Sequence, residues 1–216
     1  ENTVLDYARH LLSPDNAAFL QDFSDGLQPF IRAGLLNGLT QTVIKLTAPG
    51  VPDIYQGSEG LNFSLVDPDN RREPDFAALA SDLAAGSPAL FHDERAWRDG
   101  RLKQFVTAGL LRLRPRFSGL LRHGDWLPLK AEDDDEGRVI AYARTGGEGV
   151  IIVVAPRLAF SAVAGGLPAG EALWGSARVS IPPALAAMRF RELFSNESRI
   201  LGETLTLAQE AVRVLV

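Results

Sequence analysis

Residues 47–59 read TAPGVPDIYQGSE, and this stretch decides how the first half of the chain is expected to fold. A helical pattern ends at Pro49-Gly50, and a short apolar run, Val51 to Tyr55, follows it. From there to Arg72 the chain is polar, with acid, amide and arginine side chains and little apolar content. A strand that delivers a polar loop to the mouth of a barrel or sheet has this pattern. The stretch therefore predicts a strand at Val51–Tyr55 with a functional loop behind it.

Two motifs in this region carry a resemblance to known enzymes. The pattern PG-x-P-x-I-Y-x-G-x-E, residues 49–59, resembles the last barrel strand of the α-amylase superfamily, and DPDNR, residues 67–71, resembles its sugar-binding loop. The longer string SLVDPDNRR, residues 64–72, resembles the maltooligosyltrehalose synthase family of glucosylmutases. Patches at 126–129, 141–144 and 153–158 resemble the C-terminal region of that family. The resemblance covers nearly the whole chain but corresponds only to the last part of such an enzyme.

Composition excludes several other classes of protein. The chain has 216 residues, 46% hydrophobic and 23% charged, which suits one large or two small globular domains. A net charge of −5 gives no indication of the basic surface that binds nucleic acid. There is no cysteine, and His10, His92 and His123 are isolated, so neither a disulfide framework nor a zinc site is expected. No run approaches the length of a membrane span and no signal peptide is recognisable, so we expect a cytoplasmic protein without a membrane partner.

The predicted fold class is α+β. Residues 1–122 are expected to be the helical tail of a (β/α)8 barrel that includes its last strand, and residues 123–216 a C-terminal antiparallel β-sandwich. In the first block Ser13-Pro14 is typical of a helix start, and Asp25-Gly26 of a break between two helices. The predicted helices are residues 2–12, a region of helical spacing from 19 to 46, residues 75–84, and residues 101–113, the last ended or kinked by Pro115.

In the second block short β-rich runs alternate with turn clusters, which is typical of a sandwich. The acidic run Glu132–Glu136 falls between the first two of these runs. Clustered carboxylates suit calcium, and a solvated hairpin tip is the alternative. The predicted strands are residues 126–129, 139–144, 149–155, 177–181, 189–193 and 211–216.

Carboxylates are the first candidates for catalysis, because retaining glycosidic chemistry needs a nucleophile and an acid/base. The resemblance implies that both come from earlier barrel strands, outside this chain. We therefore assign no catalytic residue. The acids near the expected mouth of the barrel are Asp53, Glu59, Asp67, Asp69, Glu73 and Asp75.

Asp67 and Arg71 are the strongest candidates for substrate binding. A carboxylate accepts hydroxyl protons and a guanidinium presents a rigid fork of donors, so the two suit a sugar. The resemblance implies that both contact a glucose unit next to the cleaved bond. The alternative is that they pair with each other and only brace the loop.

Four further residues complete the predicted binding set. Asn70 suits a turn in which its amide bonds backbone. Asp69 and Arg72 belong to the motif that resembles the synthases, without an assigned role. Tyr55 is expected either to stack on a sugar ring or to pack in the barrel.

The resemblance implies the C-terminal portion of an intramolecular α-glucosylmutase. Such an enzyme breaks the reducing-end α-1,4 bond of a maltooligosaccharide, retains the glucose and rejoins it through an α,α-1,1 bond, without a cofactor. The alternatives are another hydrolase or glucanotransferase of the α-amylase superfamily, and a non-catalytic glucan-binding module.

The first block is expected to expose apolar surface, because one barrel strand without its neighbours cannot close a barrel. Either the N-terminal part of the same enzyme or another copy of the chain is expected to cover that surface. By itself the chain is expected to be inactive.

Overall fold

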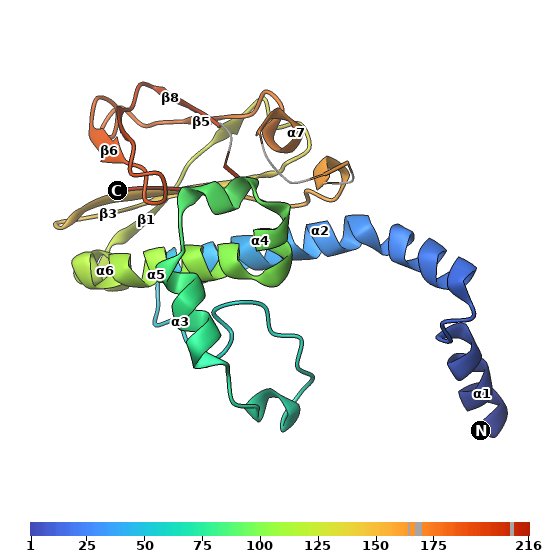
Figure 1. The fold of residues 1–216 in the computed structure, drawn as a ribbon. Coiled ribbons are helices and arrows are strands. Elements are labelled where there is room, and N and C mark those ends of the chain that lie inside the picture. The colour runs from blue at the N-terminus through green and yellow to red at the C-terminus, as the bar shows by residue number, and fades with distance from the viewer. Residues whose placement is uncertain (164, 167–169, 208–209) are drawn as a thin grey trace.

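The computed structural model describes residues 1–163, 165–166, 170–207 and 210–216, and it combines a helical first half with antiparallel sheets in the second half (Figure 1). The mixed helix and sheet class is therefore as predicted. The first half contains α1 (Asn2–Leu11), α2 (Ala17–Thr47), η1 (Asp69–Arg71), α3 (Phe76–Ala84), η2 (Pro88–His92), α4 (Glu94–Asp99), α5 (Arg101–Arg116) and α6 (Ser118–His123).

The described residues of the second half form three sheets. A four-stranded sheet has the order β1-β3-β4-β9, a three-stranded sheet the order β2-β5-β8, and β6 pairs with β7. Every pairing is antiparallel. The elements are β1 (Asp125–Pro128), β2 (Ala131–Glu132), β3 (Val139–Gly146), β4 (Gly149–Pro156), η3 (Ser161–Val163), α7 (Gly170–Trp174), β5 (Arg178–Ser180), β6 (Arg189–Arg191), β7 (Ser198–Ile200), β8 (Thr204–Thr206) and β9 (Arg213–Leu215).

The helix starting at Ala17 differs from the prediction in two ways. It begins after Asn16 rather than at Ser13-Pro14, and it runs for 31 residues without the break expected at Asp25-Gly26. A single glycine costs a helix only about 1 kcal/mol, and the Gln21 amide bridges that turn by donating to both Asp25 oxygens, at 2.9 and 3.0 Å. The helix therefore continues through Asp25-Gly26, although these two residues favour a break.

The strand predicted at Val51–Tyr55 is wrong, because this segment has no regular secondary structure. A strand satisfies its backbone groups through a neighbouring strand, and the described chain places none beside it. Lysine and arginine side chains bind part of this backbone instead. Lys45 Nζ donates to the Asp53 carbonyl at 3.1 Å and Arg114 Nη2 to the Gly50 carbonyl at 3.2 Å.

The six predicted β-rich runs all contain strands, whereas β2, β7 and β8 were not predicted. These three have only two or three residues each, too few to show alternation. The acidic run enters through β2, and Asp134 then turns the chain by accepting from Arg138 N at 2.7 Å and Val139 N at 3.0 Å. In the described part of the chain, no group of His, Asp or Glu side chains could hold a metal ion.

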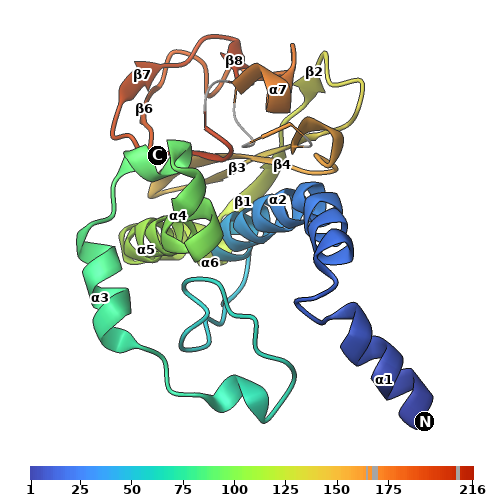
Figure 2. The same ribbon diagram turned by 45° about the vertical axis from the view of Figure 1, so that its right-hand side comes forward.

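The two halves pack together along one layer of helices. The C-terminal half of α2, with α5 and α6, lies against the four-stranded sheet (Figures 1 and 2), where α2 contacts β4 and α6 contacts β3. A cluster of Phe91, Phe105 and Phe194, with ring centroids 5.7 to 6.5 Å apart, joins the helices to the segment after β6. Buried apolar residues from Leu36 to Leu215 form one core.

Buried charges fix the ends of this core. Arg144 on β3 has no exposed surface and donates only to backbone carbonyls. Near the C-terminus, Arg213 Nε donates to Glu192 Oε2 at 3.2 Å, and Glu192 Oε1 accepts from Val214 N at 3.1 Å. Burial raises the pKa of Glu192, and the Arg213 guanidinium opposes that shift. The pair holds β9 at the edge of its sheet.

The N-terminal helices leave the body of the molecule. In both ribbon views α1 and the first turns of α2 project away from the sheets (Figures 1 and 2), and α1 buries no residue. Within the described ranges, no helix is long and apolar enough to cross a membrane. The large apolar side chains exposed on these two helices and at the end of α1 are Val4, Leu5, Tyr7, Leu12, Phe23, Phe30 and Ile31.

Tyr142 gives a prediction about alkaline stability. Its hydroxyl lies 2.5 Å from Thr47 Oγ1, and burial raises the pKa of Tyr142 to about 12 from the ordinary value of 10. Because the folded pKa is the higher one, this contribution to stability is complete below pH 10 and is lost as the pH rises towards 12. The full loss is about 2–3 kcal/mol.

Urea unfolding at pH 9 and pH 11.5 measures this loss. The wild-type chain is expected to lose more stability between the two values than Tyr142→Phe, which has no phenol to ionise there. Tyr55→Phe, which removes an exposed phenol, is the control and should behave like wild type. Equal losses for Tyr142→Phe and wild type would show that Tyr142 does not control the alkaline limit.

Candidate functional site

The connection between α2 and α3, residues 48–75, is the candidate site. It leaves the helical layer at the end of α2, swings out, and returns at α3 with η1 near its outer end (Figures 1 and 2). Asp75 ends it by capping α3, with its Oδ1 accepting from Ala78 N at 2.9 Å. All the predicted binding residues lie in this connection, which is called the substrate loop below.

Asp67 and Arg71 form a two-bonded fork. Arg71 Nε donates to Asp67 Oδ1 at 2.6 Å, and Nη2 donates to Oδ2 at 2.8 Å. Both side chains are more than half exposed, at 67% for Arg71 and 58% for Asp67. The bracing interaction considered from the sequence is therefore present. The outer donors and lone pairs of the same fork face solvent, where ligand hydroxyls can reach them.

Asp69 and Arg72 form a second pair, one turn further along. Arg72 Nη2 donates to Asp69 Oδ1, and Asp69 Oδ2 accepts from Leu65 N at 2.8 Å. Asp69 is the less exposed of the two. It stabilises the turn that presents the Asp67–Arg71 fork, whereas the Arg72 side chain is 77% exposed.

Asn70 and Tyr55 lie in contrasting surroundings. Asn70 is half-buried, and its Oδ1 is buried without a hydrogen-bond partner within the described chain. Tyr55 is 47% exposed, so its ring does not pack in a core here. Its carbonyl accepts from Ser58 N at 3.0 Å, which starts the first turn of the substrate loop. Asn70 therefore has hydrogen-bonding capacity left over, and about half of the Tyr55 surface is open to solvent.

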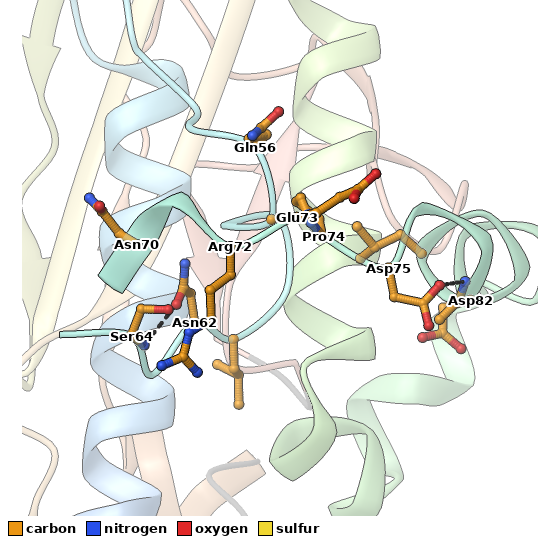
Figure 3. A pocket seen from close by; sticks show the side chains of 13 residues that line it. Gln56, Asn62, Ser64, Asn70, Arg72, Glu73, Pro74, Asp75 and Asp82 are labelled. Carbon is orange, nitrogen blue, oxygen red and sulfur yellow. Dashed lines mark hydrogen bonds between the residues drawn. The ribbon is translucent and has the colours of Figure 1, made fainter. Parts of the chain in front are cut away.

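A cavity of about 280 Å³ lies between the substrate loop and α3 (Figure 3). The structure brings Asn70 and Arg72 into its wall, whereas Asp67, Asp69, Arg71 and Tyr55 lie outside it. Sequence reasoning missed the contribution of several polar residues, since amides and hydroxyls in a loop carry no motif of their own. The lining of the cavity includes Gln56, Asn62, Ser64, Glu73, Asp75 and Asp82, with Leu61, Ala78 and Leu79 as apolar members.

This wall suits a hydroxyl-rich ligand. Amide, hydroxyl, carboxylate and guanidinium groups provide both donors and acceptors, and the apolar members offer surface for the face of a ring. Asn62 and Arg72 both line the cavity (Figure 3), and Asn62 Oδ1 accepts from Ser64 N at 2.8 Å. Polar groups held in this way are ordered before a ligand arrives.

Three acids of the substrate loop are engaged in its own structure. Asp67 and Asp69 bind arginines, and Asp75 caps α3. Glu59 differs, because its Oε2 is buried without a hydrogen-bond partner among the described residues. Nothing in this arrangement assigns a nucleophile and an acid/base, and we assign no catalytic residue.

Comparison with known proteins identifies relatives of the chain. No family model matches it. Curated relatives from two strains of Mycobacterium tuberculosis, both named putative maltooligosyl trehalose synthase, are 36% identical over 118 residues, which are 55% of this chain and 14% of the relative. The solved maltooligosyltrehalose synthase from Arthrobacter ramosus is 28% identical with a TM-score of 0.69, covering 97% of this chain and 25% of that one.

A second solved structure shares the fold. The DSM5389 glycosyltrehalose synthase has a TM-score of 0.68 at 23% identity, and the match covers all of this chain and 25% of that one. The chain thus spans only a small part of the relatives that it matches. The resemblance expected from residues 64–72 is confirmed, since the relatives found by sequence and by structure are maltooligosyltrehalose synthases.

Proposed function

We propose that this chain is the C-terminal portion of an intramolecular α-glucosylmutase. The enzyme converts the reducing-end α-1,4 linkage of a maltooligosaccharide into an α,α-1,1 linkage. The observation that carries the proposal is the match of 97% of the chain to the Arthrobacter ramosus synthase at a TM-score of 0.69. The polar substrate loop with its exposed Asp67–Arg71 fork agrees with a sugar ligand.

The reaction assigns different tasks to this chain and to the rest of the enzyme. A carboxylate elsewhere in the enzyme attacks the anomeric carbon, and an acid protonates the departing glucose oxygen. The freed glucose stays bound, turns, and attacks the intermediate with its anomeric hydroxyl. The proton of that hydroxyl passes to the conjugate base of the acid, and the carboxylate leaves the anomeric carbon, so both groups are regenerated. The Asp67–Arg71 fork holds a glucosyl unit by hydrogen bonds to its hydroxyls. A closed pocket keeps water from replacing the glucose.

The proposal also assigns partners. The maltooligosaccharide is the substrate, and the N-terminal part of the enzyme covers the exposed apolar faces of α1 and α2. Self-association of the chain is the alternative cover for those faces. The chemistry requires no cofactor, and a cytoplasmic location fits a chain without cysteine.

Two other functions compete with this one. A hydrolase or glucanotransferase of the α-amylase superfamily uses the same kind of loop but passes the glycosyl group to water or to another glucan. A glucan-binding module binds the substrate without turning it over. Reducing ends are lost with the mutase, gained with a hydrolase, and unchanged in number with either a glucanotransferase that joins two glucans or a binding module. The glucanotransferase changes the chain lengths of the glucans and the module does not, so reducing ends and product lengths together separate these functions.

The test is the incubation of maltopentaose with the full-length protein that carries this chain. Loss of reducing ends without a matching release of glucose is expected of the mutase. The 216-residue chain, assayed alone at the same concentration, is expected to show no turnover, because it is not assigned the catalytic carboxylates. A gain of reducing ends would favour the hydrolase, and turnover by the chain alone would contradict the division of tasks.

A further inference from the structure

Lys103 on α5 holds the first part of the substrate loop. Its Nζ donates to the carbonyls of Ser58 and Gly60, each at 2.7 Å. The side chain is half-buried, and burial lowers the pKa of its amine, as does the charge of Lys45, whereas Glu59 raises it. Two short bonds from one donor fix two carbonyls two residues apart, which is a specific constraint on the backbone between them.

A second contact lies beside it, at the corner between α4 and α5. Gly100 has a φ of +89°, and a Cβ at this position would lie 2.7 Å from Leu61 N. The corner therefore needs glycine for two reasons, its left-handed backbone and the close approach of the loop. Leu61 follows directly after the Gly60 carbonyl that Lys103 binds, so the two contacts act on the same short segment.

The corner itself is firmly held. Arg101 Nε donates to Asp99 Oδ2 at 2.8 Å, and its Nη2 donates to Asp93 Oδ2 at 3.3 Å. Arg98 Nη2 donates to Gln28 Oε1 at 2.8 Å, which ties α4 to α2. The segment that Lys103 and Gly100 contact is thus fixed to the helical layer rather than to another loop.

Beyond this segment, the apolar side chains of the outer loop do not pack in the core. Phe63, Leu65 and Val66 are each at least 78% exposed. The Asp67–Arg71 and Asp69–Arg72 pairs lie within the loop itself, so they shape it without fixing its position relative to the helices. The position of the outer loop therefore depends on the contacts at 58–61 at one end and on the Asp75 cap of α3 at the other.

We propose that Lys103, with Gly100 beside it, is a positioning residue that sets where the substrate loop presents the Asp67–Arg71 fork to the sugar. The inference rests on the proposed function for its consequence in catalysis. Its structural part concerns only this chain. The two parts can therefore be tested separately.

The structural part is tested by limited trypsin digestion of the 216-residue chain, with cleavage after Arg71 and Arg72 as the readout. Cleavage there needs local opening of the loop, and its rate follows the population of the open form. In Lys103→Met, cleavage after Arg71 and Arg72 is expected to be about tenfold faster, because the two bonds to the ammonium are lost. Cleavage after Arg9, in the distant helix α1, should not change.

Three further variants sharpen this test. Lys103→Arg keeps donors within reach of both carbonyls and should restore most of the protection. Gly100→Ala, which pushes Leu61 away without changing a charge, should accelerate cleavage as Lys103→Met does. Lys130→Met, which removes an exposed lysine of the second half, is the matched control and should digest like wild type. Unchanged cleavage after Arg71 and Arg72 in Lys103→Met, or equal acceleration after Arg9, would overturn the proposal.

The catalytic part is tested in the full-length enzyme with maltopentaose. Displacing a binding loop weakens the hold on substrate in the ground state and in the transition state alike, so KM is expected to rise about tenfold in Lys103→Met with a smaller change in kcat. Lys103→Arg should return KM towards wild type. If cleavage accelerates but the kinetic constants of Lys103→Met stay at wild type, the loop does not contact substrate, and the proposed role of the fork is wrong while Lys103 still positions the loop.

Discussion

Arg144→Met is expected to destabilise the chain by about 3–5 kcal/mol, a very large effect for one side chain. The guanidinium donates to five carbonyls. Nη2 donates to Leu120 and Gly124 at 2.9 Å each, Nη1 to Thr47 at 3.0 Å and Leu121 at 3.2 Å, and Nε to Asp125 at 3.3 Å. One residue therefore joins the end of α2, the end of α6 and the four-stranded sheet.

The magnitude follows from what the substitution leaves behind. None of these five partners is a carboxylate, so the positive charge is balanced by the carbonyl ends of two helices, where the helix dipole is negative. Burial lowers the pKa of Arg144, yet an arginine starts so high that it stays charged. Methionine fills most of the space but donates nothing, and each buried carbonyl left without a partner costs about 1–3 kcal/mol before relaxation.

Urea unfolding followed by circular dichroism measures this effect, and a melting temperature lower by about 6–20 °C is expected with it. Arg144→Lys should recover only part of the loss, because a point charge cannot reach five carbonyls spread over two helices and a strand. Arg122→Met, at an exposed arginine on α6, is the control and should stay within about 0.5 kcal/mol of wild type. A small change for Arg144→Met would mean that water replaces the guanidinium at these carbonyls.

Elements that depend on nearby residues were predictable from the sequence. The Asp75 side chain caps α3 by accepting from the amide three residues later. The strand run 139–144 is indicated by its own apolar residues. Both features depend only on residues that are close together in the sequence. The Asp67–Arg71 pair, considered from the sequence as the alternative to sugar binding, is likewise local, since its two partners are four residues apart. For these features local sequence and final structure agree.

Features that depend on distant partners were not predictable in this way. Arg144 appeared only as one charge in an apolar run, and its Thr47 partner lies 97 residues away. Lys103 binds carbonyls 43 and 45 residues earlier, and carbonyls carry no sequence signal. The predicted strand at Val51–Tyr55 was wrong for the same reason, because a strand needs a neighbouring strand and the described residues place none there.

The second large effect is expected for Arg71→Ala in the full-length enzyme, where kcat/KM should fall about 10–100-fold. The magnitude separates the two roles considered for the fork. An exposed ion pair that only braces a loop contributes about 0.2–1 kcal/mol, which limits its effect to about fivefold. A charge-assisted bond to a bound sugar is worth about 1.5–3 kcal/mol, so a larger loss requires contact with the substrate.

The variants that complete this experiment separate contact from folding. Arg71→Lys should recover only part of the activity, because an ammonium cannot reproduce the planar fork that Asp67 and a sugar hydroxyl share. Arg199→Ala removes a half-buried arginine of the second half, which pairs with Glu197 at 3.7 Å, and should retain wild-type kinetics. Trypsin cleavage after Arg72 reports whether the loop loosens in Arg71→Ala. If activity falls more than fivefold while cleavage is unchanged, Arg71 contacts the substrate. Wild-type activity in a folded Arg71→Ala enzyme would show that the Asp67–Arg71 fork only braces the loop.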